Sequence, residues 1–435
     1  MPVPTSRLAL AALALSLVVL ALPVSAPGGL LIANGILLVL AVVDGILAPR
    51  PASVGIDRDF PAVLPLNGEG RIAWTVTNPV GRRLQIGFSD ELAPSLRAGT
   101  RRVRLTVPAH DRITAETTIQ PSRRGRFEPR EVVVRVNGPL SLVARQGKRD
   151  LPGLLRVYPP FASRKEAELR IDRARILDIG LRSARGRGGG TEFDQLREYG
   201  VDDESRRIDW AATARSGKAI VRTYRAERNQ TVIIALDNGR TMAGQVAGVA
   251  RVEHAMDAVL MLTAVATRLG DRAGLVAFDR RVRAVVPPGH RVDQLTRVSE
   301  AMYQLEPELA ESDYRGAFTE TLVRFHRRAL LVLLTELADQ ALGDTLLPAL
   351  PLILRSHLVV VASVRDPALQ RWAISPAPDA GAAYRKAAAQ AALEQRRVLA
   401  AQFRGLGATV VDAPPGALAP ALADAYLKVK ATGRL

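Results

Sequence analysis

The chain has 435 residues, no cysteine and a formal net charge of +17. The length allows two or three domains with separate cores, and the lack of cysteine excludes disulfides, thiolate metal sites and thiol nucleophiles. The charge favours anionic partners such as lipid headgroups, nucleic acid or acidic proteins. Aromatic residues make up only 4% of the chain, so the stacking platforms typical of nucleic-acid binding are scarce, and no nucleic-acid partner is expected.

Residues 1–50 contain two apolar runs, LALAALALSLVVLAL from Leu8 and GLLIANGILLVLAVVDGILA from Gly29. The second run is long enough for a helix that crosses roughly 30 Å of hydrocarbon at 1.5 Å per residue. We predict two transmembrane helices that form a hairpin. Asp44 lies four residues from the end of the second run, where it is either a functional intramembrane charge or, as we prefer, a group near the headgroups.

The first run also resembles a signal peptide, because Arg7 precedes it and Val24-Ser25-Ala26 follows it like a cleavage site. In the hairpin, which we prefer, Arg7, Arg50 and Arg58 favour cytosolic ends by the positive-inside rule. With a cleaved signal, the second run becomes a stop-transfer helix. Both alternatives predict a protein of the inner (cytoplasmic) membrane with its soluble domains in the cytosol.

Residues 51–158 consist of short runs in which apolar and polar residues alternate, such as GRIAWTVTN, RRVRLTV and REVVVRVN, separated by turn-rich pieces. A period of two at this spacing is typical of antiparallel strands. We predict an all-β, immunoglobulin-like sandwich.

Residues 231–435 alternate continuous apolar strands with amphipathic helices. The predicted strands are TVIIALD, AGLVAFD, ALLVLLTE, HLVVVASV and ATVVDA, and the predicted helices lie near 250–269, 291–304, 313–328 and 383–405. Strands of this kind, each followed by a helix, predict an α/β domain with a doubly wound parallel sheet. Ligands of such sheets bind beyond the carboxyl ends of the strands.

Asp237 ends the first of these strands, and Thr241 follows in the next turn. The pattern resembles the metal-ion-dependent adhesion site of von Willebrand A domains, which is DxSxS with a later Thr and a later Asp. By this resemblance Gly239 replaces the first Ser, Ser312 stands for the Thr, and Glu336 stands for the Asp. The resemblance implies a von Willebrand A-like domain with a degenerate site.

Metal binding at Asp237, Thr241, Ser312 and Glu336 is therefore one hypothesis, with Mg²⁺ or Mn²⁺ as the ion. A lost hydroxyl and a longer carboxylate weaken a site for Mg²⁺, which demands near-ideal octahedral geometry. The alternative is a vestigial turn in which Asp237 caps a helix or pairs with Arg240.

Residues 159–230 hold the most distinctive stretch, EFDQLREYGVDDESRRIDWAATARSGKAIVRTYRAERNQ. Asp202 or Asp203 is a candidate cap for a helix through RRIDWAATAR, and Gly217 suits its end. The stretch resembles the signature of the bacterial family catalogued as domain of unknown function 58, whose members also carry two N-terminal membrane segments, a sandwich and a von Willebrand A-like end.

Within this signature, Arg206, Arg207, Asp209 and Trp210 form a candidate partner-binding surface, because Trp and Arg are favoured interface anchors. The alternative is structural. In it, Ile208 and Trp210 belong to the packed face of a helix, and Asp209 and the arginines form intramolecular salt bridges.

The family resemblance implies a partner of a MoxR-type AAA+ ATPase, acting at the membrane as an adaptor in assembly or metal insertion, with other membrane proteins of the same operon and membrane lipid as further contacts. A scaffold without enzymatic activity is the first hypothesis. One alternative is a metal-dependent hydrolase with Glu336 as general base. The other is an anionic-lipid or nucleic-acid binding protein.

Overall fold

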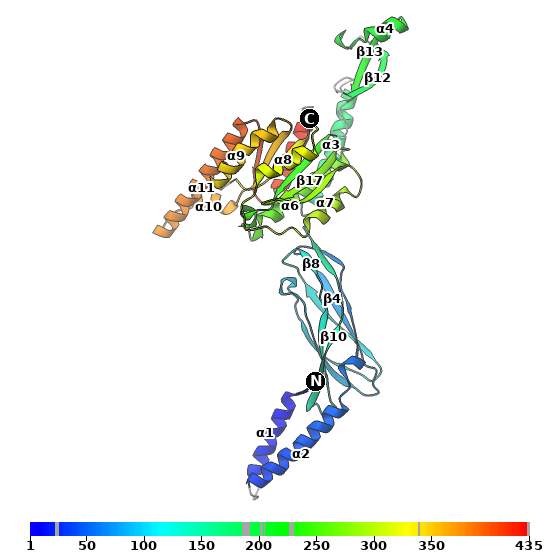
Figure 1. The fold of residues 1–435 in the computed structure, drawn as a ribbon, viewed down its shortest axis with the longest axis vertical. Helices are drawn as coiled ribbons and strands as arrows, with labels where there is room; N and C mark the ends of the chain where they lie inside the picture. The colour runs from blue at the N-terminus through cyan, green and yellow to red at the C-terminus, as the bar shows by residue number, and fades with distance from the viewer. Residues whose placement is uncertain are drawn as a thin grey trace. The chain divides into compact units, whose positions relative to one another are not determined.

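The computed structural model describes residues 1–21, 26–184, 192–200, 203, 205–225, 230–337 and 340–432. The chain separates into two compact units, Met1–Tyr158 and Pro159–Leu435. The first unit consists of a short strand, two helices and then further strands, and the second contains a mainly parallel sheet with helices (Figure 1). A mixed α/β protein, as predicted, is confirmed.

The first unit opens with a short strand, β1 (Pro2–Pro4), and two apolar helices, α1 (Ser6–Ala21) and α2 (Ala26–Leu47). Within the described residues, Pro27–Ser53 is the one stretch that is long and apolar enough to cross a membrane. Helix α1 packs beside α2 but has 16 residues, or about 24 Å against a hydrocarbon core of roughly 30 Å.

The remaining strands of the first unit belong to three sheets, with orders β1-β10-β9-β5-β6, β2-β4-β7 and β3-β11-β8. All pairs are antiparallel except β3 with β11. The elements are η1 (Pro51–Ser53), β2 (Gly55–Asp59), β3 (Val63–Pro65), β4 (Gly70–Thr77), β5 (Leu84–Asp90), η2 (Pro94–Leu96), β6 (Arg102–Val107), β7 (Arg112–Ile119), β8 (Gly125–Phe127), β9 (Glu131–Asn137), β10 (Val143–Asp150) and β11 (Leu155–Tyr158).

The core of this β unit follows from the alternation in the sequence. In β4 the buried side chains are Ile72, Trp74 and Val76, two residues apart, which is the period of a strand. Trp74 Nε1 donates to Asp90 Oδ2 over 2.7 Å, and Arg58 Nη1 donates to Asp90 Oδ1 over 2.6 Å. The two donors satisfy a carboxylate that would otherwise be costly to bury.

The second unit contains a six-stranded sheet with the order β18-β17-β14-β19-β20-β21, parallel throughout except for the edge strand β18. Its strands are β14 (Thr231–Asp237), β17 (Arg272–Phe278), β18 (Val282–Gly289), β19 (Leu330–Leu334), β20 (Leu358–Val364) and β21 (Thr409–Ala413). Between β14 and α6 lie α5 (Arg240–Ala243), β15 (Gln245–Val246) and β16 (Val249–Ala250).

Helices cover both faces of this sheet, as expected for continuous apolar strands. One buried cluster contains side chains of α3, α6, α7 and α12, and the other contains side chains of α8, α9 and α11. The helices are α3 (Arg164–Ala184), α6 (Arg251–Arg268), α7 (Gln294–Met302), α8 (Tyr314–Arg324), α9 (Gln340–Leu354), α10 (Pro367–Ile374), α11 (Ala380–Gly405) and α12 (Leu418–Ala431).

The four predicted helices correspond to α6, α7, α8 and α11. Helices α3, α9, α10 and α12 were not predicted. Pro348 and Pro351 lie inside α9, and proline in a helix interior removes a hydrogen bond and clashes with the preceding turn. The two prolines in the sequence therefore predict no helix here, and tertiary packing of the apolar side chains of α9 stabilises it.

Strands β12 (Glu192–Glu198) and β13 (Ile220–Arg225) form a small antiparallel hairpin, and this hairpin with the described residues between its strands is called the signature lobe. Between the strands lie η3 (Ser205–Arg207) and α4 (Trp210–Ser216). Gly217 ends α4 in the left-handed conformation with φ 68°, as predicted for a glycine at that place.

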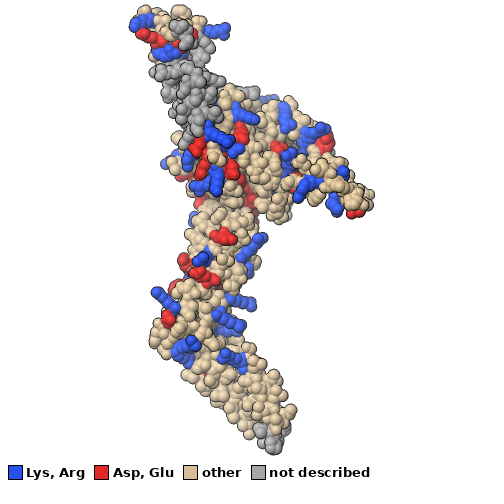
Figure 2. Space-filling view, turned by 180° about the vertical axis from the view of Figure 1, so that it is seen from behind, with Lys and Arg blue, Asp and Glu red and all other residues tan. Residues whose placement is uncertain are grey.

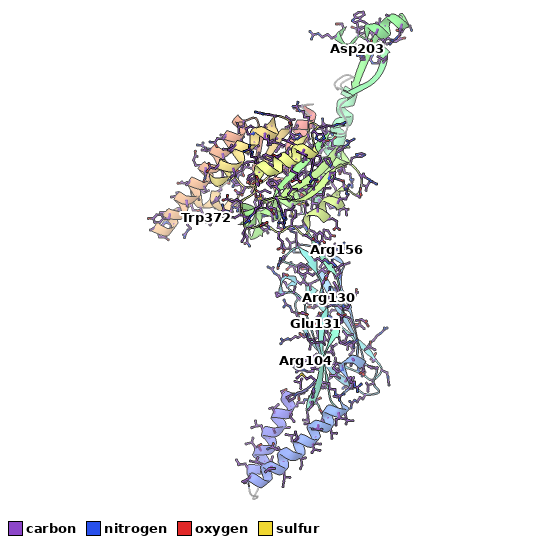
Figure 3. All side chains as sticks on the ribbon, viewed as in Figure 1. Arg104, Arg130, Glu131, Arg156, Asp203 and Trp372 are labelled. Atoms are coloured by element: carbon purple, nitrogen blue, oxygen red, sulfur yellow. The ribbon has the colours of Figure 1, made fainter. Side chains whose placement is uncertain are left out.

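The predicted cap of this helix was wrong. Asp209 is the N-cap. Asp203, which is labelled in Figure 3, accepts instead from Arg197 over 2.5 Å and from the backbone N–H of Gly200 over 2.8 Å. Asp202 lies outside the described residues. The helix starts later than predicted because Arg206 and Arg207 belong to the 3-10 turn η3 and Ile208 forms an isolated antiparallel bridge with Val221.

Candidate functional site

Asp237 lies at the carboxyl end of β14, and its side chain is fully buried. Its Oδ1 accepts from the N–H of Gly239 over 2.9 Å and from Ser312 Oγ over 2.5 Å. Its Oδ2 accepts from the hydroxyls of Tyr314 and Thr335, each over 2.6 Å. Both oxygens of the carboxylate are thus occupied by donors of the protein itself.

Three elements bring these donors together. Thr335 directly follows β19, which is paired in parallel with β14, so their carboxyl ends meet at one edge. Tyr314 is the first residue of α8, which Asp313 caps by accepting from the N–H of Gly316. The loop before α8 is held by the N–H of Arg240, which donates to the carbonyl of Ala310 over 2.8 Å.

The glycine in place of the first serine has a steric reason. A Cβ placed on Gly239 would collide with the Oγ of Ser312. The hydroxyl that position 239 lacks is therefore supplied from the loop before α8, and the two positions do not accommodate a serine each in this arrangement.

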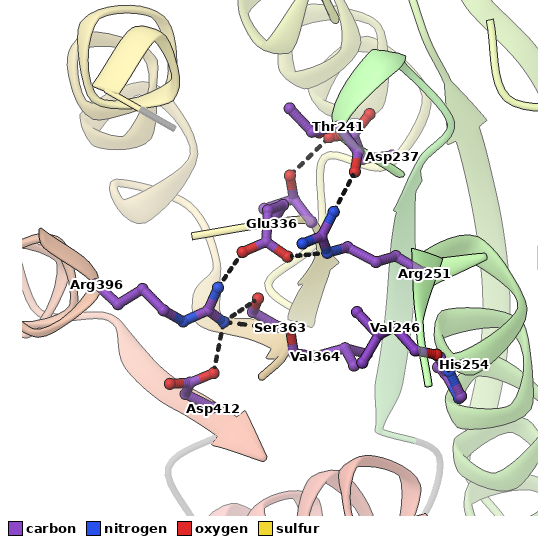
Figure 4. A network of polar contacts seen from close by, with 11 residues as sticks. Asp237, Thr241, Val246, Arg251, His254, Glu336, Ser363, Val364, Arg396 and Asp412 are labelled. Atoms are coloured by element: carbon purple, nitrogen blue, oxygen red, sulfur yellow. Dashed lines mark hydrogen bonds and ion pairs between the residues drawn. The ribbon is translucent and has the colours of Figure 1, made fainter. Parts of the chain in front are cut away.

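Thr241 lies in α5 and enters the site through its backbone, because its carbonyl accepts from Arg251 Nη1 over 3.3 Å. Glu336 is buried at the carboxyl edge of the sheet. Its Oε2 lies 2.7 Å from Arg251 Nε, and its Oε1 contacts Arg396 Nη1 (Figure 4). Of the four candidate metal ligands, Ser312 donates a hydrogen bond to Asp237, whereas Glu336 forms ion pairs with two arginines.

Arg396, in the middle of α11, connects Glu336 to the next two strands of the sheet (Figure 4). Its Nη2 donates to Ser363 Oγ over 2.9 Å and to Asp412 Oδ1 over 2.7 Å. Burial opposes the charge of this guanidinium, but the charges and hydrogen bonds of Glu336 and Asp412 prevail and raise the pKa of Arg396 above its usual value. Arg396 therefore stays a cation inside the protein.

This arrangement does not fit a divalent ion. The Asp237 carboxylate faces four hydrogen-bond donors, and the Glu336 carboxylate faces two guanidinium groups that repel any further cation. Within the described residues, no group of three or more His, Cys, Asp or Glu side chains is placed to hold a metal. Asp237 and Ser312 belong to a hydrogen-bonded group, called the Asp237 corner. Glu336 belongs to an ion network with Arg251 and Arg396, called the Glu336 network, and Thr241 contacts it through the hydrogen bond from Arg251 to its carbonyl.

Sequence reasoning missed Tyr314, Arg251, Arg396 and Asp412. A signal existed for Thr335, which is the first polar residue after the apolar run of β19. None existed for the two arginines, because Lys and Arg together number 60 in this chain. No spacing distinguishes the two arginines that reach Glu336 from the rest.

The candidate partner-binding residues lie in the signature lobe and divide into two groups. The Asp209 carboxylate accepts from the N–H groups of Ala211 and Ala212, over 3.1 and 3.0 Å, and from Arg222 Nε over 2.7 Å. The hydrogen bond from Arg222, followed by that from Ala212, lowers the pKa of Asp209. Asp209 thus acts inside the lobe, as the structural alternative proposed.

Trp210 differs, because 71% of its surface is exposed. Arg206 is exposed as well, and the side chain of Arg207 lies outside the described residues. The structural alternative expected Trp210 in a packed helix face, and that expectation was wrong. The side chain that α4 buries is Ala212.

Comparison with known proteins gives one sequence family. The model of a family described as "Protein of unknown function DUF58" matches residues 195–378, which include most of the signature lobe and both the Asp237 corner and the Glu336 network up to β20. No curated protein matches the chain.

Solved structures resemble the chain only distantly. An uncharacterized membrane spanning protein from Vibrio fischeri is 14% identical, over 47% of this chain and 99% of its own, with a TM-score of 0.18. The CARDB domain of the PF1109 protein from Pyrococcus furiosus is 8% identical, over 22% of this chain and 86% of its own, with a TM-score of 0.16. Similarities this low carry no argument about function.

Proposed function

The chain belongs to the family described as protein of unknown function DUF58, and on that premise we propose that it is a membrane-tethered cytosolic scaffold. Its partner would be a MoxR-type AAA+ ATPase, and its role the assembly or maturation of a protein complex. The resemblance of the signature stretch to this family suggests the partner.

The carboxyl edge of the sheet supports binding over catalysis. The strand order β18-β17-β14-β19-β20-β21, with one antiparallel edge strand, is compatible with the von Willebrand A-like fold that we propose for this unit. Within the described residues, the edge holds a carboxylate that accepts four hydrogen bonds and another that lies between two arginines. These interactions fix loops in place, which suits a rigid scaffold.

The observation that carries the proposal is the exposure of Trp210 on a helix that is fixed from within. Asp209 caps α4 and Gly217 ends it, so the indole is presented on an ordered element at little cost in entropy. Trp and Arg are enriched among residues that dominate binding energy. Trp210 and Arg206 are therefore our candidate contacts for the ATPase, together with Arg207.

The membrane tether is supported by the apolar stretch Pro27–Ser53. We propose that α1 and α2 enter the bilayer together as a hairpin, with α1 reaching less deeply because it is shorter. Arg7, in the first turn of α1, and Arg50, just after α2, favour the cytosolic side for both ends.

The test is recovery of the ATPase by the full chain in lipid nanodiscs, from a lysate of the source cells with a non-hydrolysable ATP analogue. We expect an AAA+ ATPase of the MoxR type among the proteins identified by mass spectrometry. Trp210→Ala should then weaken binding of the purified ATPase at least tenfold, as expected for an interface anchor.

A matched control is Trp372→Ala. Trp372 lies on α10 and is 46% exposed (Figure 3), so its removal changes surface aromatic content without touching the signature lobe. Recovery of no AAA+ ATPase with nucleotide present would remove the proposal. Equal weakening by both substitutions would remove the assignment of the surface.

A further inference from the structure

Asp44, in the last turn of α2, ties this helix to the β unit. Its carboxylate is fully buried, and it accepts from the backbone N–H groups of Leu140, Leu142 and Val143 over 2.7, 2.8 and 2.9 Å. A Cβ on Gly138 would collide with the Asp44 carboxylate, so only glycine fits there. The loop 138–142 is thereby held at the depth of Asp44.

The chain before α1 attaches to the same end of the β unit. Strand β1 pairs antiparallel with the start of β10, with Val3 opposite Ala144. Thr5 Oγ1 donates to the carbonyl of Ser141 over 2.6 Å. Both the entry to α1 and the exit from α2 are therefore fixed beside the loop 138–142, and loss of residues 1–26 would remove an edge strand.

A second loop reaches the level where the apolar helix ends. Arg82 Nη2 donates to the carbonyl of Leu47, the last residue of α2, over 2.5 Å. Arg83 beside it is exposed, and Arg112 begins β7 opposite the end of β4. Asp111 is an exposed acid at this end. The two N-terminal helices show an uncharged surface, and Lys and Arg side chains appear on the neighbouring part of the β unit (Figure 2).

An apolar side chain projects from the same end. Leu140 is 52% exposed, although its backbone is held by Asp44 one helical turn before the end of α2. An exposed leucine at the depth of an apolar helix, with arginines at the helix end, matches the layering of a bilayer surface, in which basic groups meet anionic headgroups above the acyl chains.

We infer that this end of the β unit, residues 78–83, 108–112 and 138–142, is a lipid-binding face that rests on anionic phospholipid headgroups. Leu140 lies in the interface, and Arg82 and Arg83 contact phosphates. The inference rests on the proposed membrane tether, and it adds a second attachment that fixes how the β unit stands on the membrane.

The chain has no cysteine, so single cysteines can be labelled with an environment-sensitive nitrobenzoxadiazole probe in the full chain. The positions are Leu140→Cys in the face, Leu38→Cys in α2, and Ser122→Cys beyond the far end of β7. The labelled proteins are placed in phosphatidylcholine nanodiscs with or without phosphatidylglycerol, and quenching by nitroxide lipids is measured. We expect quenching at 140 and 38 and none at 122.

The charge is tested by Arg82→Gln with Arg83→Gln, against Arg71→Gln with Arg97→Gln at the other end of the β unit. Phosphatidylglycerol should increase quenching at 140 at least twofold, and only the first pair should abolish that increase. An unquenched probe at 140 beside a quenched probe at 38 would overturn the face and leave the tether. An unquenched probe at 38 would overturn the tether. Equal quenching at position 140 with and without phosphatidylglycerol would overturn the role of anionic headgroups.

Discussion

Glu336 Oε2 lies 2.7 Å from Arg251 Nε at the carboxyl edge of the sheet, while its Oε1 contacts Arg396. The carboxylate that we proposed as a metal ligand by resemblance thus faces two cations from the protein's own chain. Arg396 is 3% exposed and Arg251 is 21% exposed by side chain, so solvent screens this network little. The consequences can be measured.

Replacing Glu336 with Ala should destabilise the second unit strongly, because the change removes one of the two carboxylates that balance the buried guanidinium of Arg396 and leaves Asp412 as the other. Breaking a buried ion pair in this way costs about 3–5 kcal/mol. The measurement is hydrogen exchange of β14 and β19 peptides across a denaturant series. Glu311→Ala is the control, since Glu311 is 67% exposed and pairs with Arg240 at 3.5 Å, and should cost less than about 1 kcal/mol. Equal effects of the two would contradict the network's role.

Mg²⁺, Mn²⁺ or EDTA should leave the stability of the second unit unchanged, since the Asp237 carboxylate already accepts four hydrogen bonds. A site with Kd a thousandfold below the ion concentration would stabilise it by about 4.1 kcal/mol. Hydrogen exchange of the β14 and β19 peptides, measured with and without ions, distinguishes a site that binds no metal from one that does. An ion-dependent rise that Asp237→Asn removes would show that metal does bind here.

The contact between α3 and α6 should weaken as pH rises. Burial raises the pKa of Asp257, while hydrogen bonds from Ser163 partly oppose this rise. Because the folded state holds the proton at a pH where the unfolded chain has lost it, folding is favoured at low pH, and this contribution is lost as pH passes from the ordinary aspartate pKa through the raised one.

Asp257→Asn should remove this pH dependence and keep an oxygen that accepts from the N–H and Oγ of Ser163, both at 3.0 Å. Exchange of residues 164–174 as a function of pH provides the measurement. The exposed Asp172 supplies the control as Asp172→Asn, which should leave the profile unaltered. A wild-type profile flat from pH 4 to 7, or one that Asp257→Asn does not flatten, would refute this assignment.

Asp209 combines two roles that substitutions separate. Asp209→Asn keeps an oxygen for the N–H groups of Ala211 and Ala212 and loses the ion pair with Arg222, whose side chain is 50% exposed. Asp209→Ala loses the cap as well, and exchange of α4 amides should become roughly five-fold faster than in Asp209→Asn, as expected for a lost N-cap. Indistinguishable exchange in the two variants would show that the ion pair alone matters.

Much of the architecture was predictable because it rests on local periodicity. The period of two around Ile72, Trp74 and Val76 predicted strands of the β unit, and the uninterrupted apolar runs predicted the parallel sheet. Asp237 was identifiable as a residue of the sheet's edge because it ends such a run. Helix α9 could not be predicted from local sequence, because two prolines lie inside a helix that tertiary packing stabilises.

What surrounds each polar group was decided by the tertiary structure. Ser312 and Thr335 reach Asp237 from 75 and 98 residues away, and Arg396 reaches Glu336 from 60 residues away. The sequence determined that carboxylates stand at the ends of buried strands, since strand ends follow from periodicity. Whether each carboxylate meets a hydroxyl, a guanidinium or a backbone amide depends on elements distant in the chain, because burial requires a partner without specifying which residue provides it.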